Sequence, residues 1–176
     1  ILSETASRGR QRGRELRVQL LGAKKAHLHA PAVRPIFVDL PPERAREGFC
    51  CRLKTCLYGT RDAPRQWEAY AAAVLLKAGF VRGKASAVCF WHPRRNLRCL
   101  IHGDDFLLAG GDRDLDWAVA RLREDILLKD GRLGAGAQDA KEIRCLNRVL
   151  RWTPDGYEVE ADPRHAEILA AMLGED

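Results

Sequence analysis

The sequence has no long hydrophobic run. In a chain of 176 residues, no apolar segment approaches the roughly 20 residues that a membrane-spanning helix needs. Long internal repeats are also absent, and residues 1–17 contain no apolar segment typical of a signal peptide. These absences predict a protein that is not secreted, has no membrane partner and resides in the cytoplasm or the nucleus. Because the chain begins at Ile1 rather than Met, we expect a fragment or a piece of a polyprotein.

The chain also lacks the paired cysteine spacing of disulfide frameworks and zinc sites. No Cys-x-x-Cys pair occurs among its six cysteines, which are Cys50, Cys51, Cys56, Cys89, Cys99 and Cys145. Without a secretory signal, free and mostly buried thiols are expected, which agrees with an intracellular setting.

The charge of the chain is concentrated near its N-terminus. Hydrophobic residues make up 46% and charged residues 31%, which is typical of a globular chain of one domain or part of one. Residues 1–25 hold seven basic and two acidic residues, a net +5 out of the total +6. This basic arm is either a footprint for nucleic acid or a solvated end of the chain.

Hydrophobic spacing predicts a helix over residues 62–78. Asp62 is a candidate N-cap, Pro64 suits the first turn, and Gly79 ends the pattern. The apolar residues recur at three- and four-residue spacing, at Trp67, Tyr70, Ala71, Val74, Leu75 and Ala78. A second helix is predicted from Asp114 to Leu128.

Short apolar runs predict strands. One is expected at Ile36–Val38, within a proline-rich segment. Three more are expected at Ala87–Trp91, Leu97–His102 and Phe106–Ala109. We interpret Gly131, Gly134 and Gly136 as a flexible linker. Near the C-terminus, Ile143–Trp152 and Tyr157–Glu160 suggest a hairpin, and Asp162–Leu173 suggests a helix. The mixture of short strands and helices indicates an α+β domain.

Two adjacent carboxylates, Asp104 and Asp105, lie between two of the predicted strands. Oxygen donors of this kind suit Mg²⁺, which is often held by one or two carboxylates together with substrate phosphates. The alternative is an ordinary exposed acidic turn.

The residues around this pair resemble a known motif. His102–Phe106, between apolar strands, is similar to the metal-binding hairpin of polymerase palm domains. Upstream, Leu53–Trp67 reads Leu-Lys-Thr-Cys-Leu-Tyr-Gly-Thr-Arg-Asp-Ala-Pro-Arg-Gln-Trp. It resembles the Lys-Ser-Leu-Tyr-Gly-Leu-Lys-Gln-Ala-Pro-Arg-x-Trp motif of copia-type retrotransposon reverse transcriptases. A viral RNA-dependent RNA polymerase would rest on Gly-Asp-Asp alone, and the Leu53–Trp67 segment opposes it.

This resemblance, which runs from about Leu16 to Leu173, implies a fold and a domain layout. It implies a palm-type antiparallel sheet backed by helices, with partial fingers over about residues 30–58. Residues 16–152 would form the palm with these fingers, and residues 153–176 a hairpin and the start of the thumb helix. The arm, residues 1–15, would be disordered or truncated fingers, and Leu146-Asn147 would lie at the primer grip.

The resemblance also implies an activity and site residues. The activity is RNA-directed DNA synthesis with two Mg²⁺ ions. The implied partners are an RNA template, a DNA primer, deoxynucleotides and other Pol polyprotein segments. Asp104 and Asp105 would be the catalytic metal ligands, and nucleotide or template contacts would come from Lys24, Lys25, His27, Tyr58 and Gly59.

One position departs from the family pattern. Gly22-Ala-Lys-Lys-Ala-His-Leu28 matches the first motif of the family, Asp-Val/Ala-Lys-x-Ala-Phe/His-Leu, with glycine in place of the first catalytic aspartate. Glycine offers no side-chain ligand, so we expect this copy to be impaired or inactive as a polymerase. The alternative function is a non-catalytic remnant that binds nucleic acid.

Overall fold

A computed structural model describes residues 16–146, 148–160 and 163–174. Residues 1–15 of the expected basic arm, Asn147 and Asp162 lie outside the described residues. These residues form antiparallel sheets and three α-helices, so the α+β class is confirmed.

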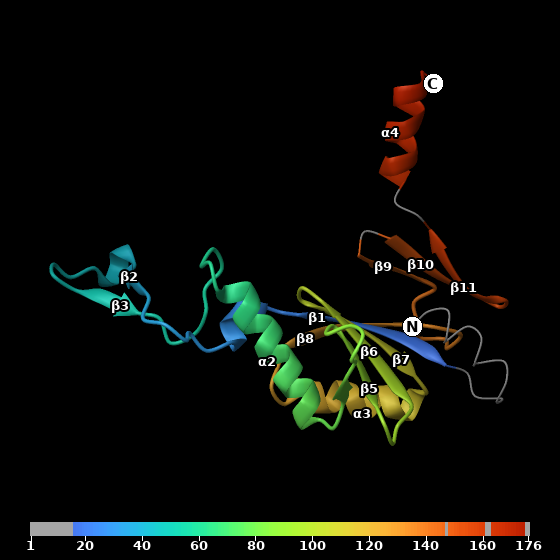
Figure 1. Cartoon of the computed structure of the whole chain (residues 1–176), viewed down its shortest axis with the longest axis horizontal. Helices are drawn as coiled ribbons and strands as arrows, with labels where there is room; N and C mark the ends of the chain where they lie inside the picture. The colour runs from blue at the N-terminus through green and yellow to red at the C-terminus, as the bar shows by residue number, and fades with distance from the viewer. Residues whose placement is uncertain (1–15, 147, 161–162, 175–176) are drawn as a thin grey trace.

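A six-stranded antiparallel sheet forms the body of the molecule, in the order β4-β5-β6-β7-β1-β8. Strand β1, from the start of the described chain, lies between β7 and β8 (Figure 1). It therefore brings the Gly22 segment beside the turn that holds Asp104 and Asp105, which we call the acidic turn. The strands are β1 (Arg17–Ala23), β4 (Val81–Arg82), β5 (Cys89–His92), β6 (Leu97–His102), β7 (Asp105–Gly110) and β8 (Leu128–Leu133).

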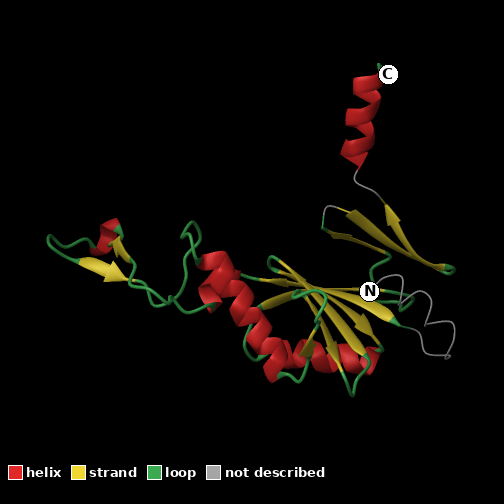
Figure 2. Cartoon of the chain, in the orientation of Figure 1, coloured by secondary structure: helices red, strands yellow, loops and turns green. Residues whose placement is uncertain are grey.

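Helices α2 (Ala63–Lys77) and α3 (Asp112–Arg123) cover one face of this sheet. Buried side chains of α2, including Trp67 and Leu75, pack with Phe106 of β7 in the main core. The opposite face carries a smaller core that joins β1, β7 and β8 to a three-stranded sheet. Figure 2 shows the two layers on either side of the central sheet.

The predicted helix over residues 62–78 is present, but its N-cap differs. Asp62 stands at the N-cap position without a capping bond. Its carboxylate instead accepts hydrogen bonds from Nε and an Nη of Arg34, both at 3.1 Å. The C-terminal end follows the prediction: Gly79 has φ +90°, and Phe80 donates its N–H to the Leu75 carbonyl at 3.0 Å, as in a Schellman cap.

The predicted helix Asp114–Leu128 is too long. Helix α3 ends at Arg123, and Leu128 begins β8, where it pairs with Ala23. Buried Ile126 continues the apolar spacing, although it lies in the turn after the helix. Pairing of β8 with β1 therefore overrides the helical pattern in the last part of the predicted segment.

The flexible glycine linker is also wrong. Gly131 lies within β8, paired with Leu20. Gly134 and Gly136 pack against the Arg17–Asp139 ion pair, whose N···O distance is 2.8 Å. Gly131 is part of a strand, and a Cβ atom at Gly134 or Gly136 would come within 3 Å of the Asp139 carboxylate, so all three glycines belong to ordered structure.

The expected strand Ile143–Trp152 is divided in two by a turn at Leu146, whose φ is +53°. A three-stranded sheet results, with the order β11-β10-β9. The predicted hairpin with Tyr157–Glu160 is present between β10 and β11. The strands are β9 (Glu142–Cys145), β10 (Arg148–Thr153) and β11 (Gly156–Glu160).

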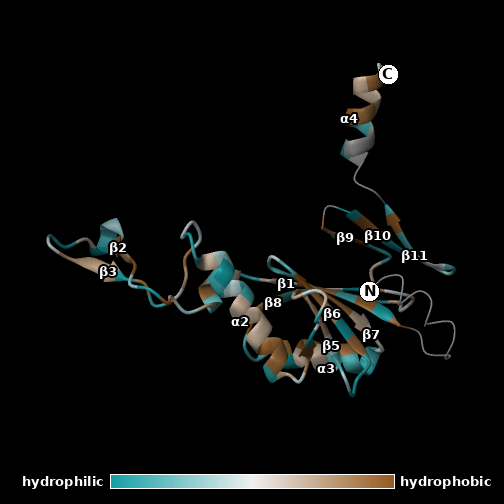
Figure 3. Cartoon of the chain, viewed as in Figure 1, coloured by the Kyte–Doolittle hydropathy of each residue, from teal (hydrophilic) through white to brown (hydrophobic). Residues whose placement is uncertain are grey.

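Two parts of the chain extend away from the body in Figure 1. One is built on β2 (Phe37–Asp39) and β3 (Cys50–Arg52), with a 3₁₀ turn at Pro42–Arg44. The other is helix α4 (Pro163–Leu173), with apolar residues on its surface (Figure 3). A second 3₁₀ turn, Ala26–His29, packs against α2 in the body. Among the described helices, none is long and apolar enough to cross a membrane.

Candidate functional site

The acidic turn joins β6 to β7. His102 pairs with Asp105, so Gly103 and Asp104 form a two-residue turn. Gly103 has φ +57°, a left-handed conformation that glycine adopts without strain. The turn is fixed from two sides: the Trp67 indole donates to the Gly103 carbonyl at 2.7 Å, and the Ala23 N–H donates to the Asp104 carbonyl at 2.8 Å. The hydrogen bond from Trp67 to the turn was missed by sequence reasoning, which placed this residue in the helix pattern and at the end of the Leu53–Trp67 motif.

The two carboxylates of this turn have different environments. Asp104 is exposed and Asp105 is half-buried. Burial raises the pKa of Asp105, the negative charge of Asp104 raises it further, and His102 lowers it in part. No ion pair within the described residues involves either carboxylate. The site therefore concentrates negative charge without a neutralising cation.

Gly22 lies directly beside Asp105 on the neighbouring strand. The two residues are paired between β1 and β7. A Cβ atom at Gly22 would lie 3.6 Å from Oδ1 of Asp105 and would meet no other described atom within 4 Å. A side chain at this position would therefore point toward the Asp105 carboxylate. Across the part of the chain that the structure describes, no group of three or more His, Cys, Asp or Glu side chains is placed to hold a metal ion.

A small cavity of about 190 Å³ lies beside Asp104. It contains His27 and Tyr58, whose ring centroids are 4.3 Å apart. Nδ1 of His27 is buried and has no hydrogen-bond partner in the structure. The fold thus brings two of the residues expected at a nucleotide contact next to the acidic turn. Glu68 also lines this cavity and was not singled out from the sequence, because its place in the helix pattern is that of an ordinary exposed residue.

Three other expected contact residues lie outside the lining of this cavity. Lys24 and Lys25 are both exposed, and Lys25 has φ +55° at the start of a 3₁₀ turn. Gly59 is exposed with φ +87°. The backbone of Lys24 is held on both sides: its N–H donates to the Leu127 carbonyl at 2.8 Å, and its carbonyl lies 3.1 Å from Nε2 of His29.

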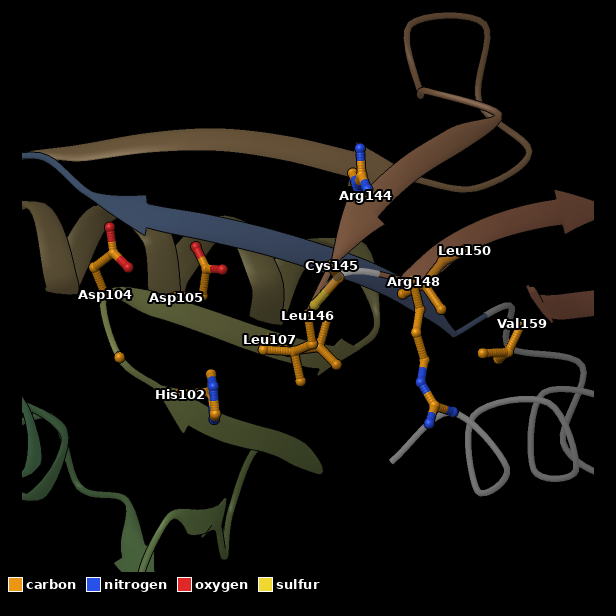
Figure 4. A pocket seen from close by; sticks show the side chains of 11 residues that line it. His102, Asp104, Asp105, Leu107, Arg144, Cys145, Leu146, Arg148, Leu150 and Val159 are labelled. Carbon is orange, nitrogen blue, oxygen red and sulfur yellow. The ribbon is translucent and has the colours of Figure 1, made fainter. Parts of the chain in front are cut away.

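A larger cleft, of about 960 Å³, opens on the other side of the acidic turn. Figure 4 shows the carboxylates at one end and side chains of the three-stranded sheet at the other. Arg144 and Arg148 line it, and neither was identified from the sequence, where no motif marks them. Cys145 also lines it, and burial, followed by the charge of Asp105, raises the pKa of its thiol. The complete lining is His102, Gly103, Asp104, Asp105, Leu107, Arg144, Cys145, Leu146, Arg148, Leu150 and Val159.

Comparison with known proteins bears on this arrangement. No family model matches the chain. It is 28% identical over 100 residues, 54% of its length, to the retrovirus-related Pol polyprotein from transposon RE2 of Arabidopsis thaliana. It is also 28% identical over 56% of its length to that from transposon RE1 of the same plant, and 27% identical over 64% to that from transposon TNT 1-94 of Nicotiana tabacum. The chain resembles the Pol polyproteins of copia-type retrotransposons. The resemblance inferred from its motifs is confirmed, and the matched part spans only 7–9% of the length of these Pol polyproteins.

Proposed function

We propose that this chain is the palm region of a copia-type reverse transcriptase and that its own form does not catalyse nucleotidyl transfer. The observation that carries the proposal is the pairing of Gly22 with Asp105. The family pattern has an aspartate at the position of Gly22, and a side chain there would point at the Asp105 carboxylate from 3.6 Å. The similarity to Pol polyproteins supports the same assignment. In this proposal residues 30–58 belong to the fingers and α4 begins the thumb.

The residues present do not fit a pair of Mg²⁺ ions. A two-ion centre holds its metals roughly 4 Å apart and needs ligands shared between them. Asp104 and Asp105 are adjacent in the chain, and Gly22 contributes no donor atom. We therefore derive no catalytic step through metal ions in the chain as it stands.

The chain's own residues can still bind the proposed partners. The neighbouring rings of His27 and Tyr58, which are tilted by 31° relative to each other, offer a surface for a nucleotide beside the acidic turn. Arg144 and Arg148 present guanidinium groups at the cleft, and such groups bind phosphate oxygens. RNA template, DNA primer and deoxynucleotides are the partners for which this arrangement is proposed, together with other segments of the Pol polyprotein.

A second candidate function, nucleic-acid binding without catalysis, is favoured by the same two arginines. They line a cleft of about 960 Å³ whose floor includes apolar Leu107 and Leu150. Binding of this kind requires neither the missing carboxylate nor a metal ion, because phosphate contacts by arginine supply sequence-independent affinity.

Primer extension on an RNA template tests the proposal. The unaltered chain, Gly22→Asp and Gly22→Asp/Asp104→Ala are compared in Mg²⁺, with Gly22→Asn as the control of equal size and no charge. We expect extension from Gly22→Asp alone, because only that variant adds a third carboxylate while keeping the other two. Calorimetric titration with Mg²⁺ should show at least about tenfold tighter binding to Gly22→Asp than to Gly22→Asn, since the variants differ only in charge.

Extension by the unaltered chain would contradict the role given to Gly22. Equal Mg²⁺ affinity of Gly22→Asp and Gly22→Asn would show that the added carboxylate does not join Asp104 and Asp105. Binding of a primer–template duplex by the unaltered chain, without extension by any variant, would favour the second candidate function.

A further inference from the structure

Trp91 differs from the other tryptophans of the chain in having no polar or ring partner. The Trp67 indole donates to a carbonyl, Trp117 contacts three side chains through ring and cation–π interactions, and Trp152 lies 4.8 Å from the Lys141 ammonium. No hydrogen bond or ring contact is present for Trp91 in the described structure. It is also 43% exposed, which leaves a large aromatic surface in water.

The register of the sheet places Trp91 between an apolar and a basic side chain. It pairs with Val81 of β4 on one side and with Arg98 of β6 on the other. Directly paired residues point to the same face of a sheet, so the three side chains form a row across three strands. Val81 is 42% exposed. The Arg98 guanidinium is held by hydrogen bonds to the Asn96 side chain and the Leu97 carbonyl, at 3.4 and 3.3 Å.

This row lies on the same face of the sheet as the acidic turn. Arg98 and His102 are four residues apart on β6, and side chains alternate between faces along a strand. His102 lines the larger cleft, so the Trp91 row and the cleft open on one face. Four residues of strand correspond to about 13 Å. That distance equals about four steps of a nucleic-acid strand at 3.4 Å each.

We propose that Trp91 and Arg98 form a stacking platform for an unpaired RNA strand whose path continues from the larger cleft. This inference rests on the proposed function, which supplies RNA as the partner. An exposed aromatic ring beside a guanidinium group is the combination that single-strand-binding proteins use: bases stack on the ring and the arginine binds the phosphate backbone.

The same observations argue against a protein partner at this row. Its two large apolar side chains, Val81 and Trp91, offer far less area than the roughly 800 Å² that each partner contributes to a stable protein interface. A base on Trp91 requires only one ring face, and stacking tolerates any sequence.

The platform is tested by fluorescence anisotropy with the full chain and a labelled 12-nucleotide oligouridine RNA, in EDTA. We expect Trp91→Ala to weaken binding about tenfold and Trp91→Phe to remain within about threefold of the unaltered chain, because phenylalanine keeps a ring for stacking. Arg98→Ala should weaken binding. It should also reduce the slope of log K against log salt concentration by about 1, the value for one phosphate contact. Leu76→Ala is the matched control, since Leu76 is also exposed but lies on α2, which covers the opposite face. Circular dichroism of each variant verifies folding.

The outcomes separate the platform from the proposed function. Unchanged affinity of folded Trp91→Ala, with RNA binding by the unaltered chain, overturns the platform and leaves the proposed function in place. No RNA binding by the unaltered chain overturns both. If sedimentation instead shows that Trp91→Ala dissociates a dimer without changing RNA affinity, the surface joins two copies of the chain and the platform is wrong. If Trp91→Ala loses as much affinity for oligothymidine DNA as for oligouridine RNA, the platform stacks on bases without recognising the sugar.

Discussion

At Asp105, two physical effects oppose ionisation of the carboxyl group. Burial removes solvation from the charged form, and the adjacent Asp104 carboxylate repels it. Both effects raise the pKa above its ordinary value, and the smaller effect of His102 does not cancel them. Sites that bind cations hold carboxylates together in this way, and without the cation the arrangement costs stability.

Replacement of Asp105 by asparagine is therefore expected to stabilise the protein at neutral pH. A carboxyl group with a raised pKa in the folded state stabilises that state below the unfolded pKa, about 3.9 for aspartate, and this contribution is lost as pH rises through the folded pKa. Asparagine carries no charge, so burial and the Asp104 carboxylate do not oppose folding of this variant in the same way. We expect Asp105→Asn to raise the free energy of unfolding at pH 7 by up to about 1 kcal/mol, which corresponds to an increase in Tm of roughly 2–4 °C.

Thermal unfolding of both proteins from pH 3 to pH 8 measures this effect. The difference in Tm should shrink as pH falls toward 3.9. Asp39→Asn is the control, because Asp39 is exposed on β2 and its replacement removes a carboxylate that lacks the burial of Asp105. A stabilisation that does not depend on pH would show that ionisation of Asp105 is not its cause.

At the scale of elements, the connection from β8 to β9 holds β1 in place through an ion pair, and we call this contact the β1 clamp. Arg17 of β1 pairs with Asp139 at 2.8 Å, and the N–H of Gly136 donates to the same carboxylate at 2.8 Å. A Cβ atom at Gly136 would lie 2.6 Å from Asp139 Oδ2 and 2.9 Å from an Nη of Arg17. Such contacts are too short for the ion pair to remain in place.

Gly136→Ala should accordingly destabilise the protein by about 1–3 kcal/mol, the usual cost of overpacking. Urea denaturation measures the change. Gly131→Ala is the matched control, because a Cβ atom at Gly131 in β8 meets no described atom within 4 Å and its φ is not left-handed. Equal stability of the two variants would mean that the glycine at 136 is not required for the Arg17–Asp139 contact.

This clamp also shows what the sequence does not reveal about the elements. The helix over residues 62–78 and the β6–β7 hairpin follow from local spacing and turn residues, and both are present. Gly136 meets Arg17 from the far end of the chain, and no local pattern encodes that contact. The turn at Leu146 that divides β9 from β10 lacks a glycine or proline at its left-handed position, so the sequence indicated one strand.

The candidate site, like the secondary structure, could be predicted from the sequence only in part. The family motifs supplied the residues of the acidic turn and the Gly22 position, and β1–β7 pairing places Gly22 next to Asp105. Arg144 and Arg148 belong to β9 and β10, which reach the cleft only through packing of the second sheet on the first. Their side chains carry no spacing signal, because they alternate with apolar residues as in any half-buried strand.

At the scale of the whole molecule, the stabilising contacts are concentrated in the body and α4 contributes few. The core clusters on the two faces of the central sheet draw on that sheet, α2, α3 and the second sheet, and a third cluster joins α2 to Ala30 and Cys56. None of their described members comes from α4. Leu169 is 60% exposed and Met172 is 78% exposed on this helix. Apolar side chains that remain in water contribute little to folding.

A charge on α4 should therefore leave the body intact. We expect Leu169→Asp to change the free energy of unfolding by less than about 0.5 kcal/mol, the usual range for surface substitutions. Leu122→Asp in α3 is the comparison, because Leu122 is completely buried and a carboxylate there would prevent folding. Light scattering should also show less self-association of Leu169→Asp, since the substitution interrupts the apolar surface of the helix. Denaturation that shows Leu169→Asp to be as destabilised as a core substitution would mean that α4 packs against apolar surface in solution, and the stability of the chain would then depend on the helix as well as on the body.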